Sequence, residues 1–289
     1  MSAFDPLASF PRAIQKRSLG NWKTFVLNRS LLIALSLVGT ALVGTPLVLG
    51  AQEGYEYEVY STHIAAPHAT AVELHTNFVQ SGRRELDEGR LPTDGALRSS
   101  FEVSRGLNRW LEGSVYFVGG VFKGRGTEYV GNRMRVTAVA PAEWRLPIDL
   151  GVSQELGYAR PGFSEHRWMY ELSPIVGKTF GRFSLLLNPA LERGFGRGGE
   201  RELELEPRAK ASYEFGDEGA LSLEYYGAVG PALSFEPAYE QHHQLFATFQ
   251  TELAHRWEIG AGIGRGFTRE SDRTVITTKL EYHFGPGRK

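Results

Sequence analysis

Histidine is the residue type in this chain that most readily suggests catalysis or metal binding, because its ring titrates near neutral pH and ligates metals. Three of the eight histidines, His63, His68 and His75, fall close together in the first third of the sequence. No carboxylate completes a recognisable ligand spacing around them, and no H-E-x-x-H motif occurs. His242 and His243 are adjacent, so in a strand they point to opposite faces and cannot share one ion. We therefore predict neither a metal site nor a cofactor.

Nucleophilic catalysis would need a serine within hydrogen-bonding reach of a histidine, and a third group that orients the ring. Ser81 follows His75 by six residues, a separation of about 20 Å in an extended strand, which excludes a direct hydrogen bond. Ser164 and His166 are closer, but no acidic partner is identifiable for them. The serine and histidine positions therefore give no catalytic residue.

A glycine-rich stretch, Gly194–Gly199 (GFGRGG), matches the spacing G-x-G-x-x-G. A dinucleotide site needs this motif between a strand and a helix. Here a stretch rich in alternating glutamates follows it, so the motif is interpreted as a surface loop.

Charged residues alternate with apolar ones along much of the chain, and the last such segment, Thr274–Phe284, is the clearest. Ile276 and Leu280 fall on one face of this segment, whereas Lys279 and Glu281 fall on the other. Adjacent side chains of a strand point to opposite faces, so the segment predicts a strand with one apolar and one polar face.

The charged positions on the polar faces are candidates for lining a polar lumen. They are Arg98, Glu102, Arg133, Arg135, Asp149, Glu155, Glu171, Glu204, Glu206, Arg208, Lys210, Glu224, Lys279 and Glu281. A buried charge is costly unless it is hydrated or paired, so such a lumen either holds water or is sealed by salt bridges. If it conducts, its acidic excess predicts a mild preference for cations.

Five short polar turns set a regular spacing for these strands. Their centres lie near positions 107, 144, 180, 217 and 255, and two alternating stretches and one longer loop separate each turn from the next. This spacing predicts up-and-down antiparallel strands with tight turns at one end and longer loops, including 122–128, at the other. Twelve strands close the pattern if the first spans 70–80, and ten or fourteen strands are the alternatives. Tyr55–His63 is then left as a periplasmic strand or an inserted segment.

The N-terminal region differs in composition from the remainder. Leu31–Gly50 is an apolar run that follows five basic residues. This arrangement predicts a secretory signal that is cleaved after Ala51, although a run of this length could also be a retained membrane helix. The predicted division is a signal segment (1–51), an N-terminal periplasmic segment (52–69) and a transmembrane barrel (70–289).

Aromatic residues near the turns favour a membrane barrel over an exported soluble β-sandwich. Trp110, Trp144 and Trp257 each lie beside a short turn, where an aromatic girdle would meet one bilayer interface. The last strand also ends on an aromatic residue, Phe284. Together with the export signal, these features predict an all-β fold: an up-and-down antiparallel transmembrane β-barrel of about twelve strands in the bacterial outer membrane.

Bulk composition excludes several partners. The formal net charge of −1 at pH 7 gives no electrostatic basis for nucleic-acid binding. The sequence contains no cysteine, so disulfides, thiolate metal sites and a lipidated cysteine are excluded. The expected partners are outer-membrane lipid and a small-molecule solute, and the sequence leaves the oligomeric state open.

Four stretches resemble a broad group of bacterial outer-membrane barrels, some of which are described as transporters found beside the enzymes of aromatic (phenol meta-pathway) degradation. They are Val72–Ser81 (VELHTNFVQS), Ser104–Tyr116 (SRGLNRWLEGSVY), Asn188–Arg193 (NPALER) and Leu223–Pro231 (LEYYGAVGP). The resemblance rests on strand and turn texture. It implies a barrel with a role in the passage of small molecules and transfers no functional residue.

Three functions are compatible with these patterns. The first is an outer-membrane channel or binding barrel for small solutes, with a polar lumen. The second is a closed structural or interaction barrel. The third is an outer-membrane lipid hydrolase, for which His75 and His166 would be the histidines to test.

Overall fold

The computed structural model describes residues 55–86, 90–164, 166–196, 202–216, 218–253 and 256–285. All of them belong to one compact unit, Thr45–Lys289. The predicted signal segment, 1–51, lies outside the described residues, as do residues 197–199 of the glycine-rich motif. Within the described ranges, the structure contains no helix with the length and hydrophobicity of a transmembrane span.

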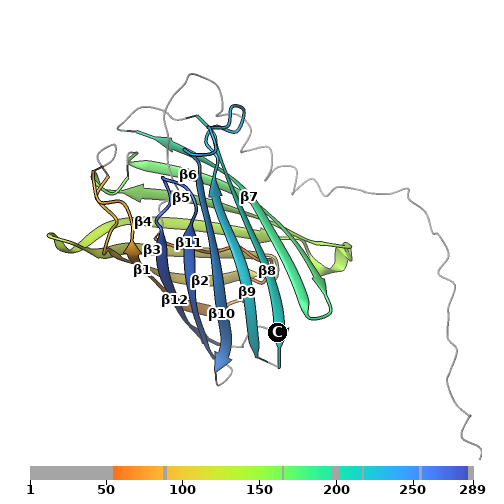
Figure 1. Ribbon diagram of the computed structural model, residues 1–289. Coiled ribbons are helices and arrows are strands. Elements are labelled where there is room, and N and C mark those ends of the chain that lie inside the picture. Colours follow the sequence, from red (N-terminus) through yellow and green to blue (C-terminus); the bar gives the residue numbers. More distant parts are fainter. Residues whose placement is uncertain are drawn as a thin grey trace, which may run out of the picture. The chain divides into compact units, whose positions relative to one another are not determined.

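The described residues form twelve antiparallel strands that close into one barrel (Figure 1). The strands are β1 (Thr70–Ser81), β2 (Leu97–Asn108), β3 (Leu111–Phe122), β4 (Gly126–Val139), β5 (Asp149–Ala159), β6 (Trp168–Phe180), β7 (Phe183–Phe195), β8 (Glu204–Phe215), β9 (Gly219–Ala228), β10 (His242–Leu253), β11 (Trp257–Gly266) and β12 (Thr274–Phe284). Each strand pairs with its neighbours in sequence, and β1 pairs with β12 from Thr70↔Phe284 to Ser81↔Thr274. The prediction of a twelve-stranded up-and-down barrel is confirmed.

Alternation along each strand separates an apolar outer face from a polar inner face. In β1, the side chains of Glu73, His75 and Asn77 are buried. Leu74 and Phe78, which point to the opposite face, are 40% and 39% exposed. The same alternation in the other strands leaves large apolar side chains on the outside of the barrel. This inside-out distribution is the one expected when lipid surrounds the wall.

The two ends of the barrel differ in their connections. Short turns join β2 to β3 and β6 to β7 at the end called here the turn end, and the 3-10 helix Ala142–Trp144 lies between β4 and β5 at the same end. At the opposite end, the loop end, the connection predicted as a long loop over 122–128 is instead a tight turn of three residues. Gly124 and Gly126 adopt φ values of 77° and 78°, which glycine reaches without steric cost, so the hairpin closes early.

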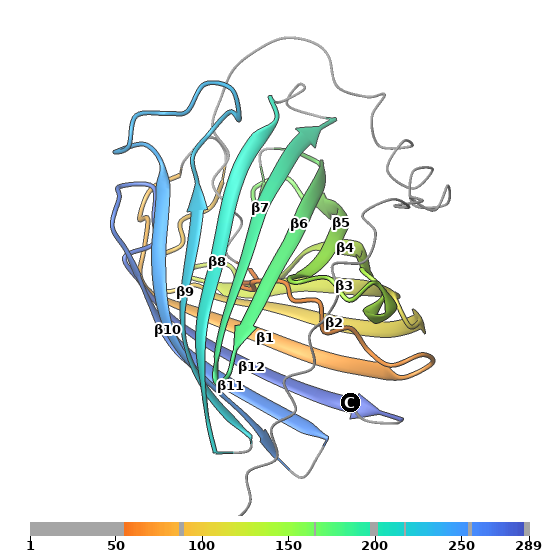
Figure 2. The same ribbon diagram turned by 90° about the vertical axis from the view of Figure 1, so that its right-hand side faces the viewer.

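The leftover segment Tyr55–His63 is not a strand in the structure. Residues 55–67, named the inner segment, run through the barrel from the loop end to the turn end (Figure 2), where Pro67 bridges Gly106. Residues 55–60 are buried or half-buried among inward-facing strand residues, as the alternative of an inserted segment expects. The division of the chain into 1–51, 52–69 and 70–289 stays a prediction.

Candidate functional site: the barrel interior

Hydrogen bonds fix the inner segment to the barrel wall along its whole length. Asn77 Nδ2 donates to the Tyr55 carbonyl at 2.9 Å, and Asn188 Nδ2 donates to the Tyr60 carbonyl at 3.1 Å. Nearer the turn end, the Ala65 amide donates to Glu112 Oε2 at 2.6 Å. Wall side chains thus replace the strand partner that the inner segment lacks, which satisfies backbone groups that burial would otherwise leave without hydrogen bonds.

Tyr55 seats the inner segment in an apolar cluster at the loop end. It is 5% exposed and packs with Tyr116, Phe122 and Phe163. The ring centroids of Phe122 and Phe163 are 5.1 Å apart. Phe163 belongs to the connection between β5 and β6, so the cluster joins a loop, the wall and the inner segment. This packing closes the barrel on one side of its loop end.

Tyr57 lies in a second apolar cluster, which contains residues from β1, β9, β10 and β12. Its ring centroid is 5.3 Å from that of Tyr226 and 4.5 Å from that of Phe246. Val79 and Val275 complete the cluster from the two strands that close the barrel. The two clusters thus pack Tyr55 and Tyr57 of the inner segment against the wall near the loop end.

Arg135 is the main cationic contact of the inner segment at mid-height. Its guanidinium lies over the ring of Tyr60 at 4.4 Å and contacts Glu58 at 3.4 Å and Glu102 at 2.8 Å. A guanidinium can stack on an aromatic face and pair with carboxylates at the same time. Arg135 therefore links the inner segment to β2 through β4.

Two rows of glutamates cross the inner face of the wall, and we call them the glutamate ladders. The first ladder runs over β2, β1, β12, β11 and β10 and consists of Glu102, Glu73, Glu281, Glu258 and Glu252. The second runs over β5, β6, β7 and β8 and consists of Glu155, Glu171, Glu192 and Glu204. Like charges directly opposite one another destabilise a sheet, so each ladder needs cations to offset the repulsion.

Basic side chains supply part of that compensation. In the first ladder, Lys279 Nζ lies 2.7 Å from Glu73 and 3.6 Å from Glu281. In the second, Arg208 contacts Glu171 through both terminal nitrogens, and Arg133 lies 3.2 Å from Glu155. The described carboxylates of the interior outnumber these cations, so the lumen carries an acidic excess.

The two glutamates of the inner segment respond differently to this environment. Glu58 lies 3.4 Å from Arg135 and 3.6 Å from Lys279. Glu56, in contrast, lies 3.7 Å from His75 and forms no ion pair with a lysine or arginine of the described residues. Glu58 is therefore a paired anion, whereas Glu56 lacks comparable compensation.

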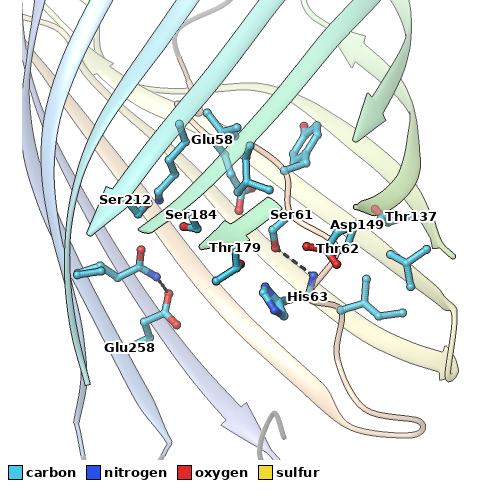
Figure 3. A pocket seen from close by; sticks show the side chains of 18 of the residues that line it. Glu58, Ser61, Thr62, His63, Thr137, Asp149, Thr179, Ser184, Ser212 and Glu258 are labelled. Carbon is cyan, nitrogen blue, oxygen red and sulfur yellow. Dashed lines mark hydrogen bonds between the residues drawn. The ribbon is translucent and has the colours of Figure 1, made fainter. Parts of the chain in front are cut away.

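A cavity of about 1440 Å³, lined by both polar and apolar residues, occupies the turn-end half of the barrel. Figure 3 shows Glu58, Thr62 and His63 of the inner segment together with wall residues that line the same cavity, such as Asp149 and Ser212. A second, much smaller space beside Glu206 and Arg208 has a volume of only about 20 Å³, enough for roughly one water molecule. The larger cavity is thus lined on one side by the inner segment, and the free space beside Glu206 and Arg208 is much smaller.

Most of the predicted lumen residues gather in this interior. The buried ones are Arg98, Glu102, Arg135, Glu155, Glu171, Glu204, Glu206, Arg208, Glu224 and Glu281. Arg133, Lys210 and Lys279 are half-buried, and Asp149 is exposed where it lines the cavity. Trp110, Trp144 and Trp257 lie at the turn end and are 45%, 44% and 42% exposed, so their placement in an interfacial girdle stays a prediction.

The inner segment and the register of the ladders are what the sequence patterns missed. The sequence does contain a signal for the ladders. Residues that face each other in a hairpin are equidistant in sequence from the centre of its turn, so two glutamates at equal distances from a turn are predicted to be opposed. Glu252 and Glu258 flank the turn centred at 255 in this way, as do Glu171 and Glu192 around the turn near 180. No comparable signal exists for the inner segment, whose alternation is that of a strand.

His75 and His166, the histidines to test for a lipid hydrolase, are both buried in the described part of the chain. His75 is 2% exposed, contacts Glu73 and lies inside the barrel, away from the lipid-facing wall. His166 is 6% exposed and packs against Gly194. His242 and His243 do point apart, because His242 contacts Gln244 inside the barrel and His243 contacts Tyr225.

The closed ring of twelve antiparallel strands, with its apolar exterior and charged interior, has the architecture of an outer-membrane β-barrel. No protein-family model matches the sequence, and no curated protein matches it. Among solved structures, an outer membrane channel from Pseudomonas putida F1 is similar over 79% of this chain and 100% of its own, with a TM-score of 0.58 and 12% identity. The KdgM porin is similar over 74% of this chain and 99% of its own, with a TM-score of 0.50 and 9% identity. At these identities the similarity shows the fold alone.

Proposed function

We propose that this chain is a bacterial outer-membrane channel for small polar solutes, and that its inner segment closes the lumen in the state described here. The observation that carries the proposal is the cavity of about 1440 Å³ inside the barrel, which the inner segment lines on one side. A barrel that served only as a scaffold would gain nothing from a hydrated, charged half-lumen. Outer-membrane lipid would contact the apolar outer face, with the three exposed tryptophans at one interface.

The acidic excess of the lumen favours cationic solutes. The exposed or half-buried carboxylates Asp149, Glu252 and Glu258 line the open cavity, where they would attract cations and repel anions. The KdgM porin has been solved in complex with oligogalacturonate, a solute that carries carboxylates itself. The present lumen does not favour such an anion.

Aromatic solutes are a second class, suggested by the resemblance to transporters found beside phenol meta-pathway enzymes. Tyr57 and Tyr60 line the cavity and are the groups that would contact an aromatic ring. A closed structural barrel is the competing function, and the narrow space beside Arg208 favours it. The two differ in whether the inner segment ever leaves the lumen.

Planar-bilayer recording of the purified full chain tests the proposal. We expect discrete conductance steps and a reversal potential, in a potassium chloride gradient, that indicates preference for cations. The double substitution Asp149→Asn with Glu252→Gln should shift that reversal potential toward zero, whereas Tyr213→Phe on the outer face should leave it unchanged. A folded barrel that never conducts, even after the inner segment is loosened as described in the Discussion, would establish the structural alternative.

A further inference from the structure

Four ligand-type side chains meet where the inner segment passes β1. Glu56 and Glu58 come from the inner segment, and Glu73 and His75 come from β1. One nitrogen or oxygen atom of each lies within 4.8 Å of the others. The histidine and three carboxylates form a donor set suited to a divalent transition-metal ion such as Zn²⁺.

Glu56 is the independent sign that this cluster lacks a partner. The residue is 7% exposed, yet among the described residues neither of its carboxylate oxygens has a hydrogen-bond partner. Its nearest basic atom is His75 Nε2, 3.7 Å from Glu56 Oε1. A buried carboxylate without compensation is strongly unfavourable, so this group requires a cation or a proton.

The neighbouring cations are engaged by other oxygens. Lys279 Nζ lies 2.7 Å from Glu73 Oε2, which leaves Glu73 Oε1 directed at His75 Nε2. The two oxygens of Glu58 lie 3.6 Å from Lys279 and 3.4 Å from Arg135. Lys279 and Arg135 therefore contact Glu73 and Glu58 from outside the cluster, and among the described residues neither forms an ion pair with Glu56.

The distances suit a metal ion with little rearrangement. Bonds of about 2.0–2.1 Å in a tetrahedral zinc site place ligand atoms about 3.3 Å apart. The 3.7 Å between Glu56 Oε1 and His75 Nε2 differs from that value by a few tenths of an ångström, which side-chain rotation can supply. The contact between Glu73 and His75 would lengthen to admit the ion.

We propose that Glu56, Glu73 and His75 bind one divalent transition-metal ion, with Glu58 or solvent at the fourth position. The ion would join the inner segment to β1 and partly neutralise the first glutamate ladder. The role of the ion in opening the lumen rests on the proposed channel function. A bound ion would hold the inner segment in place, and removal of the ion would favour release of the segment. Binding itself does not depend on conduction.

Calorimetric titration of the purified, chelator-treated full chain with zinc chloride tests the site. We expect one ion per chain, and binding at least about tenfold weaker in Glu56→Gln and in His75→Gln, because even residues that only orient metal ligands change affinity by that factor. Glu224→Gln is the matched control, since Glu224 is a buried lumen carboxylate that pairs with Lys210 away from the cluster. Glu56→Gln lies off the barrel wall, so it keeps the test valid if His75→Gln does not fold.

Three outcomes are distinguishable. Binding that both cluster variants weaken supports the site, and higher open probability in chelator than in zinc supports its role as a latch. Absence of saturable binding, with Glu56 protonated instead, overturns the inference, as does binding that neither variant alters. A channel that conducts but ignores zinc and chelator rejects the latch while leaving the proposed channel function intact.

Discussion

Replacement of Tyr57 by alanine should open the lumen. Tyr57 is 6% exposed and packs against Tyr226 and Phe246, so its side chain contributes to the docked state of the inner segment and not to the wall. A buried aromatic ring covers about 150–250 Å² of surface, and its truncation to alanine costs about 3–5 kcal/mol. Because the barrel does not lose a strand residue, that cost falls on docking and raises the equilibrium constant for release by roughly two to three and a half orders of magnitude.

Single-channel recording measures this effect as open probability. Tyr57→Phe is the matched control, because it keeps the ring and loses only the hydroxyl, which interacts with Gln244 and Arg98. A hydroxyl contact contributes about 0.5–1.5 kcal/mol, so the phenylalanine variant should change release by about tenfold at most. Cleavage after Tyr60 by chymotrypsin, followed by mass spectrometry, gives a second readout that does not depend on conductance.

The reasoning fails under a defined result. If Tyr57→Ala remains a folded, heat-modifiable barrel with the open probability and protease resistance of the unmodified chain, the inner segment is not held by this cluster. If the alanine and phenylalanine variants open equally, the hydroxyl and not the ring packing controls docking.

Two further predictions concern the wall. Gly131→Ala should lower the free energy of unfolding in detergent by about 1–3 kcal/mol, because a Cβ at Gly131 would clash with the Tyr158 carbonyl oxygen. Gly113→Ala is the control and should be tolerated, because the atom nearest to its Cβ would be 3.7 Å away. Equal stability of the two variants would contradict this prediction. In a variant that keeps Trp257 alone, lipids brominated near the headgroup should quench fluorescence more than lipids brominated near the chain end, and the reverse order would exclude the girdle.

The barrel could be predicted because two independent periods agree. Alternation within each segment assigned the faces, as in Thr274–Phe284, and the regular turns assigned the order of pairing. Both depend on local residues, which a single sequence displays. The tight turn at Gly124 and Gly126 shows the limit of that approach, because loop length depends on backbone conformation as well as on composition.

The choice between a periplasmic strand and an inserted segment could not be made from the sequence, for a physical reason. Tyr55, Tyr57 and Val59 alternate with Glu56 and Glu58, which is the pattern of a half-buried strand. Its fate depends on a non-local event, the pairing of β1 with β12, which leaves no wall position for a thirteenth strand. The juxtaposition of Glu56 with His75 follows only once the chain folds back beside β1, so separate inspection of the histidines and glutamates could not reveal the cluster.

The uninterrupted pairing of the wall also restricts how the inner segment can move. A ring with no free edge offers no lateral exit, so the segment can leave only by sliding along the barrel axis. His68 and Ala69 connect it directly to β1, which makes it a tethered blocker with an effective concentration on the order of millimolar at its own binding site. A permeating solute would therefore compete with a covalently attached rival, and recovery of the closed state would be independent of protein concentration.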